Sequence, residues 1–134
     1  MTINSETLPV NQTSMKLELF LNRLRSEPNS IEFPDAIALI NELYDYVPTS
    51  FRNEELISEA GQNVGSCKLF AFARLHDLSE SETLACFGAY YRADVLRDEQ
   101  GTSHPNIRQF METGWEGIEF FGVPLRAKPG TGER

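Results

Sequence analysis

Two adjacent segments decide the fold of this chain: the polar stretch Glu59–Lys68, EAGQNVGSCK, and the apolar run Leu69–Ala73, LFAFA. The polar stretch collects two glycines, two amides, a hydroxyl, a thiol and an ammonium group. Ser66 can cap a helix that carries Phe70 and Phe72 on different faces, so this helix is apolar nearly all round. We therefore expect a central helix with a polar turn at its N-terminal end.

Helix signals recur on both sides of this segment. Capping residues or first-turn prolines predict helix starts at Ser14, Pro34, Asn53, Ser66, Ser79 and Pro105. The segment Asn53–Gly61 is interpreted as a short helix, because Asn53 can cap it, two acids follow and Gly61 can end it. The longest helix is predicted from a capping box at Ser79 to about Arg97. Gly88 would cost about 1 kcal/mol inside that helix, so we expect another backbone to approach it closely.

The fold class expected from these signals is mainly all-α, a compact single domain of about six helices. Ile118–Phe120 alternates like a strand, and Gly122–Pro124 can turn it back, which predicts a short C-terminal β-hairpin or extended segment. The expected boundaries are a flexible polar tail at 1–13, the helical domain at 14–125 and a second flexible tail at 126–134.

Composition excludes several classes of function. The chain has 134 residues, with 12 Lys and Arg against 20 Asp and Glu, for a net charge of −8. Nucleic-acid binding depends on neutralising phosphates, so no nucleic-acid partner is expected. No apolar run is long enough to span a bilayer and no secretory signal is visible, so no membrane association is expected. The two cysteines, Cys67 and Cys86, are interpreted as reduced thiols of a cytoplasmic protein.

Five motifs follow one another between about Phe33 and Leu125: Glu59–Lys68, Thr83–Gly88 (TLACFG), Tyr91–Leu96 (YRADVL), His104–Phe110 (HPNIRQF) and Gly114–Ile118 (GWEGI). Together they resemble the HopJ type III effector family. The resemblance implies delivery into plant cells by a type III secretion machine, and the polar N-terminal tail is compatible with such an export signal. It assigns no reaction, so candidate chemistry is taken from the residues themselves.

The first chemical hypothesis is a thiol-dependent hydrolase or acyl transferase. Cys67 is expected in the first turn of the central helix, where the helix dipole can lower a thiol pKa. His104 would act as the base, with Asn106 or Asp94 orienting its ring, and Gln62 could hold an oxyanion. The competing interpretation is that Cys67 fills the core and His104 caps a helix.

The second hypothesis is a site for a small anionic ligand at the same turn. Free N–H groups at a helix start attract anions, and basic side chains could add charge. The expected ligand-binding residues are Gly61, Asn63, Gly65, Ser66, Lys68, Tyr91, Arg92, Asn106 and Arg108. The glycines could instead serve only the turn. The segment is not a nucleotide P-loop, because its lysine does not directly follow the glycine and no strand precedes it.

No metal site or cofactor is expected, because Cys67, His76, Cys86 and His104 lack the short paired spacing of structural zinc ligands. The leading functional hypothesis is a soluble binding module whose partner is an unknown protein or a small anionic ligand. The thiol enzyme is the alternative. The expected location is cytoplasmic, with type III secretion into a host cell as the alternative.

Overall fold

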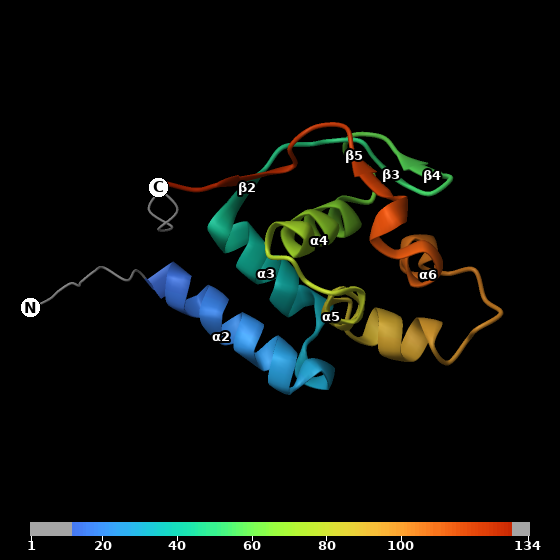
Figure 1. Cartoon of the computed structure of the whole chain (residues 1–134), viewed down its shortest axis with the longest axis horizontal. Helices are drawn as coiled ribbons and strands as arrows, with labels where there is room; N and C mark the ends of the chain where they lie inside the picture. Colours follow the sequence, from blue (N-terminus) through green and yellow to red (C-terminus); the bar gives the residue numbers. More distant parts are fainter. Residues whose placement is uncertain (1–11, 130–134) are drawn as a thin grey trace, which may run out of the picture.

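The computed structural model describes residues 12–129 as helices packed under two small sheets (Figure 1). The helices are α2 (Gln12–Ser26), η1 (Pro28–Ser30), α3 (Phe33–Leu43), α4 (Val64–Leu75), α5 (Glu80–Cys86), η2 (Tyr90–Val95), α6 (Pro105–Thr113) and η3 (Gly114–Gly117). The strands are β2 (Tyr44–Tyr46), β3 (Phe51–Asn53), β4 (Leu56–Ser58), β5 (Ile118–Phe120) and β6 (Leu125–Ala127).

Helix α4 lies at the centre of the molecule, as the sequence predicts, with α3, α5 and α6 around it and the strands along one side (Figure 1). Cys67 and the whole run Leu69–Ala73 are buried in the core. The ring of Phe70 contacts Phe51, Phe87 and Phe110, with ring centroids 5.0–6.2 Å apart. This one helix therefore joins the strands to α6 and to the end of α5.

The expectation of a mainly all-α fold is wrong. The described residues form a mixed α and β domain with five strands in two antiparallel sheets, β2–β6 and β4–β3–β5. The expected C-terminal hairpin does not form, because β5 pairs with β3 and β6 pairs with β2. Each strand is only three residues long. A period-two pattern cannot be recognised over so few residues, and β5 and β6 pair with strands that lie far earlier in the sequence.

The segment Asn53–Gly61 is a β3–β4 hairpin rather than a helix. Glu54 adopts a left-handed conformation with φ 55°, which reverses the chain between the strands. Asn53 ends β3 with its side chain fully buried. Asparagine, acidic residues and glycine favour turns as well as helix ends, so the local signals did not discriminate between the two.

The helix that begins at Ser79 has the predicted capping box but ends much earlier than predicted, at Cys86. Gly88 follows with φ +61°, and a Cβ atom there would lie 2.7 Å from Cα of Glu32. The expected close approach of another backbone is thus present. The chain continues as a π-helix, η2, from Tyr90 to Val95.

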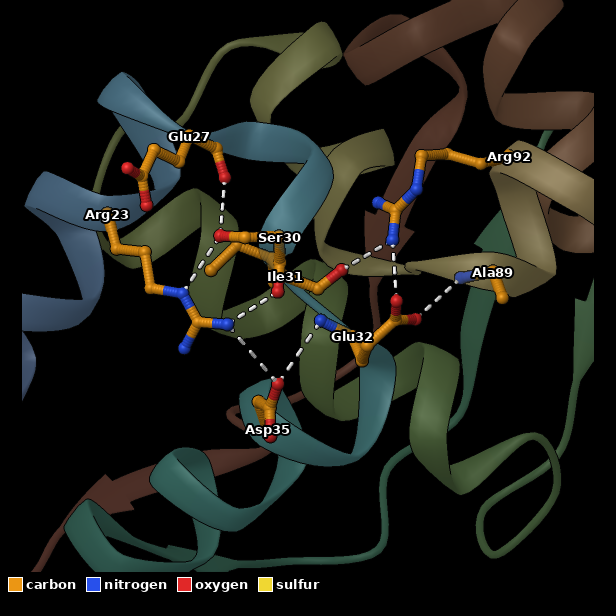
Figure 2. A network of polar contacts seen from close by, with 8 residues as sticks. All are labelled: Arg23, Glu27, Ser30, Ile31, Glu32, Asp35, Ala89 and Arg92. Atoms are coloured by element: carbon orange, nitrogen blue, oxygen red, sulfur yellow. Dashed lines mark hydrogen bonds and ion pairs between the residues drawn. The ribbon is translucent and has the colours of Figure 1, made fainter.

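A polar network holds η2 against the start of α3 (Figure 2). The carboxylate of Glu32 accepts from the N–H of Ala89 through Oε1, at 2.9 Å, and from Nη2 of Arg92 through Oε2, at 2.8 Å. Nη2 of Arg92 also donates to the carbonyl of Ile31. These contacts fix the position of Phe33, the residue after Glu32, relative to Tyr90 in η2.

The expected domain boundaries stay a prediction. Most of the two tails, residues 1–11 and 130–134, lies outside the described residues. Helix α2 begins at Gln12, two residues before the expected cap at Ser14. Strand β6 extends to Ala127, two residues past the expected end of the domain.

Candidate functional site

A cleft of about 400 Å³ lies where the N-terminal ends of α4 and α6 approach each other. We call it the α4–α6 cleft. Its lining residues are Phe33, Asn63, Gly65, Ser66, Phe87, Tyr90, His104, Pro105, Asn106 and Ile107. Asn63 and His104 are the N-cap residues of the two helices, and both are left-handed, with φ 49° and 52°. Left-handed backbone outside glycine is uncommon and occurs often at functional sites.

Both helix ends present main-chain donors. The first intrahelical hydrogen bond of α4 runs from the N–H of Cys67 to the carbonyl of Asn63, at 2.9 Å. The N–H groups of Gly65 and Ser66 precede it and have no acceptor among residues 12–129. In α6, the N–H of Asn106 likewise has no acceptor among these residues, and Pro105 before it has no N–H group. Such ends carry a partial positive charge.

The side chain of Asn106 is oriented from behind by Asn53. Nδ2 of the fully buried Asn53 donates to the main-chain O and to Oδ1 of Asn106, each at 3.0 Å. The main-chain carbonyl of Asn106 can only accept a hydrogen bond, so the Asn53 atom that faces it must be the donor Nδ2. The side-chain atom of Asn106 that faces the same Nδ2 must therefore be its acceptor, Oδ1. This leaves Nδ2 of Asn106 as an amide donor without an acceptor in the described part of the chain. Asn106 is 6% exposed.

His104 is held by two residues of η2. Nε2 of His104 lies 3.0 Å from Oδ2 of Asp94, and its ring stacks on Tyr90, with centroids 4.9 Å apart. Asp94 therefore orients the imidazole, one of the two possibilities that the sequence left open. With Nε2 committed to the carboxylate, Nδ1 accepts a hydrogen bond when the ring is neutral and donates one when it is protonated.

Aromatic rings form the remaining wall of the α4–α6 cleft. Phe33 stacks on Phe87 with parallel planes, 4° apart at a centroid distance of 5.7 Å, and lies 5.4 Å from Tyr90. Phe87 in turn contacts Phe70 in the core. The cleft therefore combines an apolar wall, anchored in the core, with hydrogen-bond donors at two helix ends.

The structure brings five of the predicted site residues together: Asn63, Gly65, Ser66, His104 and Asn106 line the α4–α6 cleft. The lining does not include the other seven, Gly61, Gln62, Cys67, Lys68, Tyr91, Arg92 and Arg108. Gln62 has a role in the turn, where its Oε1 accepts from the N–H of Glu59 at 3.0 Å. Ser66 is the third residue of α4 rather than its cap, because the helix begins at Val64.

Cys67 points into the core instead of the cleft. Its side chain is fully buried, and its Sγ donates to the carbonyl of Thr49 at 3.7 Å. Burial raises the pKa of the Cys67 thiol to about 11, although the neighbouring Tyr46 hydroxyl opposes the shift. Its N–H is already used inside α4 and cannot hold an oxyanion. Among residues 12–129 no hydrogen bond joins Cys67 to His104, and their catalytic pairing stays a prediction.

The basic side chains expected to add charge are engaged elsewhere. Lys68 donates to Oδ1 of Asn41 at 2.8 Å and lies over the ring of Tyr46. Arg92 is bound to Glu32, and Nη1 of Arg108 donates to the carbonyl of Asp98 at 2.8 Å. His104 is therefore the cleft residue that can carry a positive charge.

Sequence reasoning missed the aromatic wall and the supporting residue behind it. Phe33 precedes the expected helix start at Pro34, and Phe87 and Tyr90 were placed on one continuous helix. Only the break at Gly88 turns these rings toward Phe33. Asn53 was assigned to a helix cap, and no local signal indicated that it is buried against Asn106.

Comparison with known proteins is consistent with the motifs found in the sequence. The family model described as "HopJ type III effector protein" matches residues 17–125, well over half of the chain. The chain belongs to the HopJ type III effector family. A solved structure described as "Crystal structure of unknown function protein VPA0580" is similar to this chain, with 43% sequence identity and a TM-score of 0.82. The match covers 94% of the present chain and all of that one. The comparison with curated proteins gave no match.

Two kinds of feature are absent from residues 12–129. None of the helices there combines the length and apolar character needed to cross a bilayer. Within the same residues, His, Cys, Asp and Glu side chains form no group of three or more that could hold a metal ion.

Proposed function

We propose that this HopJ family member is a binding module for a small ligand with a carboxylate or similar oxygen-rich end and a flat apolar part. The ligand would occupy the α4–α6 cleft. The observation that carries the proposal is the amide of Asn106, which is almost fully buried, fixed by Asn53 and left with an unused donor beside the cleft. Nδ2 of Asn106 is not one of the buried atoms that lack a partner among residues 12–129, so it reaches the cleft surface, where a ligand acceptor can take the place of water.

The donors around Asn106 favour an acceptor group on the ligand. The N–H groups of Gly65, Ser66 and Asn106 and the side-chain amide of Asn106 can all donate. Two helix ends oriented toward one space favour negative charge there. When His104 is protonated, its Nδ1 adds a further donor, while Asp94 keeps the ring in place.

The apolar wall favours a flat group on the same ligand. Phe33 and Tyr90 lie at the cleft with centroids 5.4 Å apart, and Tyr90 is 42% exposed. Ligand sites commonly combine aromatic walls with a few converging polar groups, as this cleft does. A flat group packed against these rings would bury apolar area and exclude water from the donors.

The thiol-dependent hydrolase or acyl transferase remains the alternative, but the geometry gives it less support. It requires an accessible Cys67 with a lowered pKa near His104. The thiol is instead buried and has a raised pKa, and the α4–α6 cleft lining does not include it.

Amide-resolved NMR titrations with three probes would test the proposal. Benzoate has both the flat and the anionic part, acetate has only the charge and benzyl alcohol lacks the charge. We expect saturable shifts at Gly65, Ser66 and Asn106, with tighter binding of benzoate than of either other probe. Benzoate shifts that do not saturate, or that fall outside the cleft, would overturn the proposal.

A charge variant with a matched control makes the test specific. Asn106→Asp keeps the oxygen that accepts from Asn53 but places a second, anionic oxygen where the donor was. Like charge at the ligand carboxylate should weaken benzoate binding by about tenfold or more. Asn41→Asp changes the net charge equally at an exposed asparagine on α3 and should leave benzoate binding unchanged.

The place of action is a separate proposal. Family membership favours delivery into a host cell by a type III system, while the sequence alone favoured the cytoplasm. An export signal in the first dozen residues would fall almost entirely outside the described part of the chain. A fusion of residues 1–13 to a reporter, tested for type III-dependent release, would distinguish the two locations.

A further inference from the structure

A second cleft, also of about 400 Å³, lies on another part of the surface, between α2 with η1 and α5 with η2. We call it the Arg92 cleft. Its lining residues are Leu24, Arg25, Pro28, Asn29, Ser79, Ser81, Glu82, Ala85, Tyr91 and Arg92. None of these lines the α4–α6 cleft. Two of them, Tyr91 and Arg92, were among the ligand-binding residues predicted from the sequence.

Of the two terminal nitrogens of Arg92, only Nη2 has hydrogen-bond partners among the described residues. Its Nη2 donates both to Oε2 of Glu32 and to the carbonyl of Ile31, at 2.8 and 2.9 Å. Its Nη1 is buried and has no hydrogen-bond partner among the described residues. In Figure 2 all dashed lines from this side chain leave one terminal nitrogen, and the other points away from Glu32. A buried charged donor without an acceptor is costly, so an acceptor is expected there.

The Arg92 cleft also contains Arg25 and one acidic side chain, Glu82, whose two oxygens already have partners. Oε2 of Glu82 lies 3.4 Å from Nε of Arg25, and Oε1 accepts from the N–H of Ser79 at 2.9 Å. The terminal nitrogens of Arg25 have no partner in residues 12–129. Asn29 and Ser81 add polar side chains to the lining. Each arginine of this cleft has one carboxylate partner, Glu32 for Arg92 and Glu82 for Arg25, so an anion would be attracted by the unused guanidinium N–H donors rather than by a net positive charge.

We propose that the Arg92 cleft is a binding site for a small oxyanion, a phosphate or carboxylate group, held by Nη1 of Arg92 and the terminal nitrogens of Arg25. Guanidinium groups bind such oxyanions through strong, charge-assisted hydrogen bonds. Glu32 fixes the Arg92 side chain from its other edge, so the donor is oriented before the ligand arrives. This site is independent of the ligand proposed for the α4–α6 cleft.

The test is an NMR titration with inorganic phosphate and, separately, with acetate, which distinguishes a phosphoryl from a carboxylate preference. We expect saturable shifts at Tyr91 and Arg92 with at least one probe. Arg92→Lys can still pair with Glu32 but lacks Nη1, and should weaken binding by at least fivefold. Arg97→Lys makes the same change on an exposed arginine just beyond η2 and should leave binding unchanged.

Further variants keep the outcome decisive. Arg25→Gln removes the second cation and should also weaken binding by at least threefold. This variant tests the proposed site even if Arg92→Lys does not fold. Asn106→Asp, in the other cleft, should leave phosphate binding intact, so failure of one site is distinguishable from failure of the other. No saturable shift with either probe, or equal binding by wild type, Arg92→Lys and Arg25→Gln, would overturn the proposal.

Discussion

Asn53 at the end of β3 donates two hydrogen bonds of 3.0 Å to Asn106 at the start of α6, although 53 positions separate them in the sequence. Asn53 is fully buried and Asn106 nearly so. The pair links the three-stranded sheet to the helix that carries one side of the α4–α6 cleft. Through this contact the fold orients the amide on which the proposed binding function depends.

Asn53→Ala should destabilise the fold by about 1–3 kcal/mol, because two acceptors of Asn106 lose their donor in a buried place. The free energy of unfolding from urea denaturation measures the effect. Asn41→Ala, on the exposed side of α3, serves as the control and should change it by less than about 0.5 kcal/mol. Equal values for the two variants would contradict the assigned role of Asn53.

Gly88→Ala should be one of the most destabilising alanine substitutions in the chain. A Cβ atom there would lie 2.7 Å from Cα of Glu32 and 2.8 Å from N of Phe33, and φ is +61°. Gly61 also has positive φ, +91°, but nothing within 4 Å of a Cβ atom. Gly61→Ala should therefore cost about 1–2 kcal/mol from backbone conformation alone, and Gly88→Ala clearly more. Thermal unfolding of both variants would measure the difference, and similar melting temperatures would argue against the close approach.

Gly65→Ala should impair ligand binding more than folding. Alanine is favoured over glycine inside a helix by about 1 kcal/mol, which offsets the strain of a Cβ atom 2.8 Å from Cζ of Phe33. The ring of Phe33 must shift, so the α4–α6 cleft changes shape. We expect benzoate affinity to fall by about tenfold, a loss near 1.4 kcal/mol. Gly61→Ala adds the same methyl group in open space and should bind benzoate as the wild type does.

The thiols should react slowly in the native protein. Burial raises the pKa of Cys67 to about 11 and that of Cys86 to about 12, so little thiolate is present at pH 7. Alkylation by iodoacetamide, followed by mass spectrometry, should label both only slowly until denaturant is added. Rapid labelling of native Cys67 at pH 7, abolished by His104→Ala, would instead restore the thiol-enzyme hypothesis.

The same shifts predict the pH dependence of stability at alkaline pH. Since these pKa values are raised in the folded state, the folded chain holds the thiol protons more tightly than the unfolded chain, whose thiols titrate near 9.0. Stability from this source is complete below about pH 9 and is lost as pH rises through the folded pKa values. The maximal slope is about 1.4 kcal/mol per pH unit for each thiol. Cys86→Ala should reduce the slope of urea-derived stability between pH 9 and 11, and an unchanged slope would contradict the assignment.

The family, the central helix and several element ends could be predicted from local sequence. Leu69–Ala73 is apolar on every face, so this segment had to be buried wherever the rest of the chain packed. Pro34, Ser79 and Pro105 mark helix starts through local hydrogen bonding and fixed backbone angles, and those helices are present. Of the residues in the polar turn before α4, Asn63, Gly65 and Ser66 line the α4–α6 cleft, and their role in ligand binding stays a prediction.

The strand pairing and the composition of the clefts depend on long-range packing. Three-residue strands depend on their pairing partners for stability, and β5 lies far from β3 in the sequence, so no local pattern revealed that these two pair. Which side chains of α4 face the core depends on how the neighbouring elements pack against the helix. For this reason Ser66 lies at the cleft, whereas the next residue, Cys67, is buried in the core. The sequence predicts Arg92 as a ligand-binding residue but does not indicate which cleft it lines. Its contact with Glu32, made where Gly88 lets two backbones approach, determines which cleft it serves.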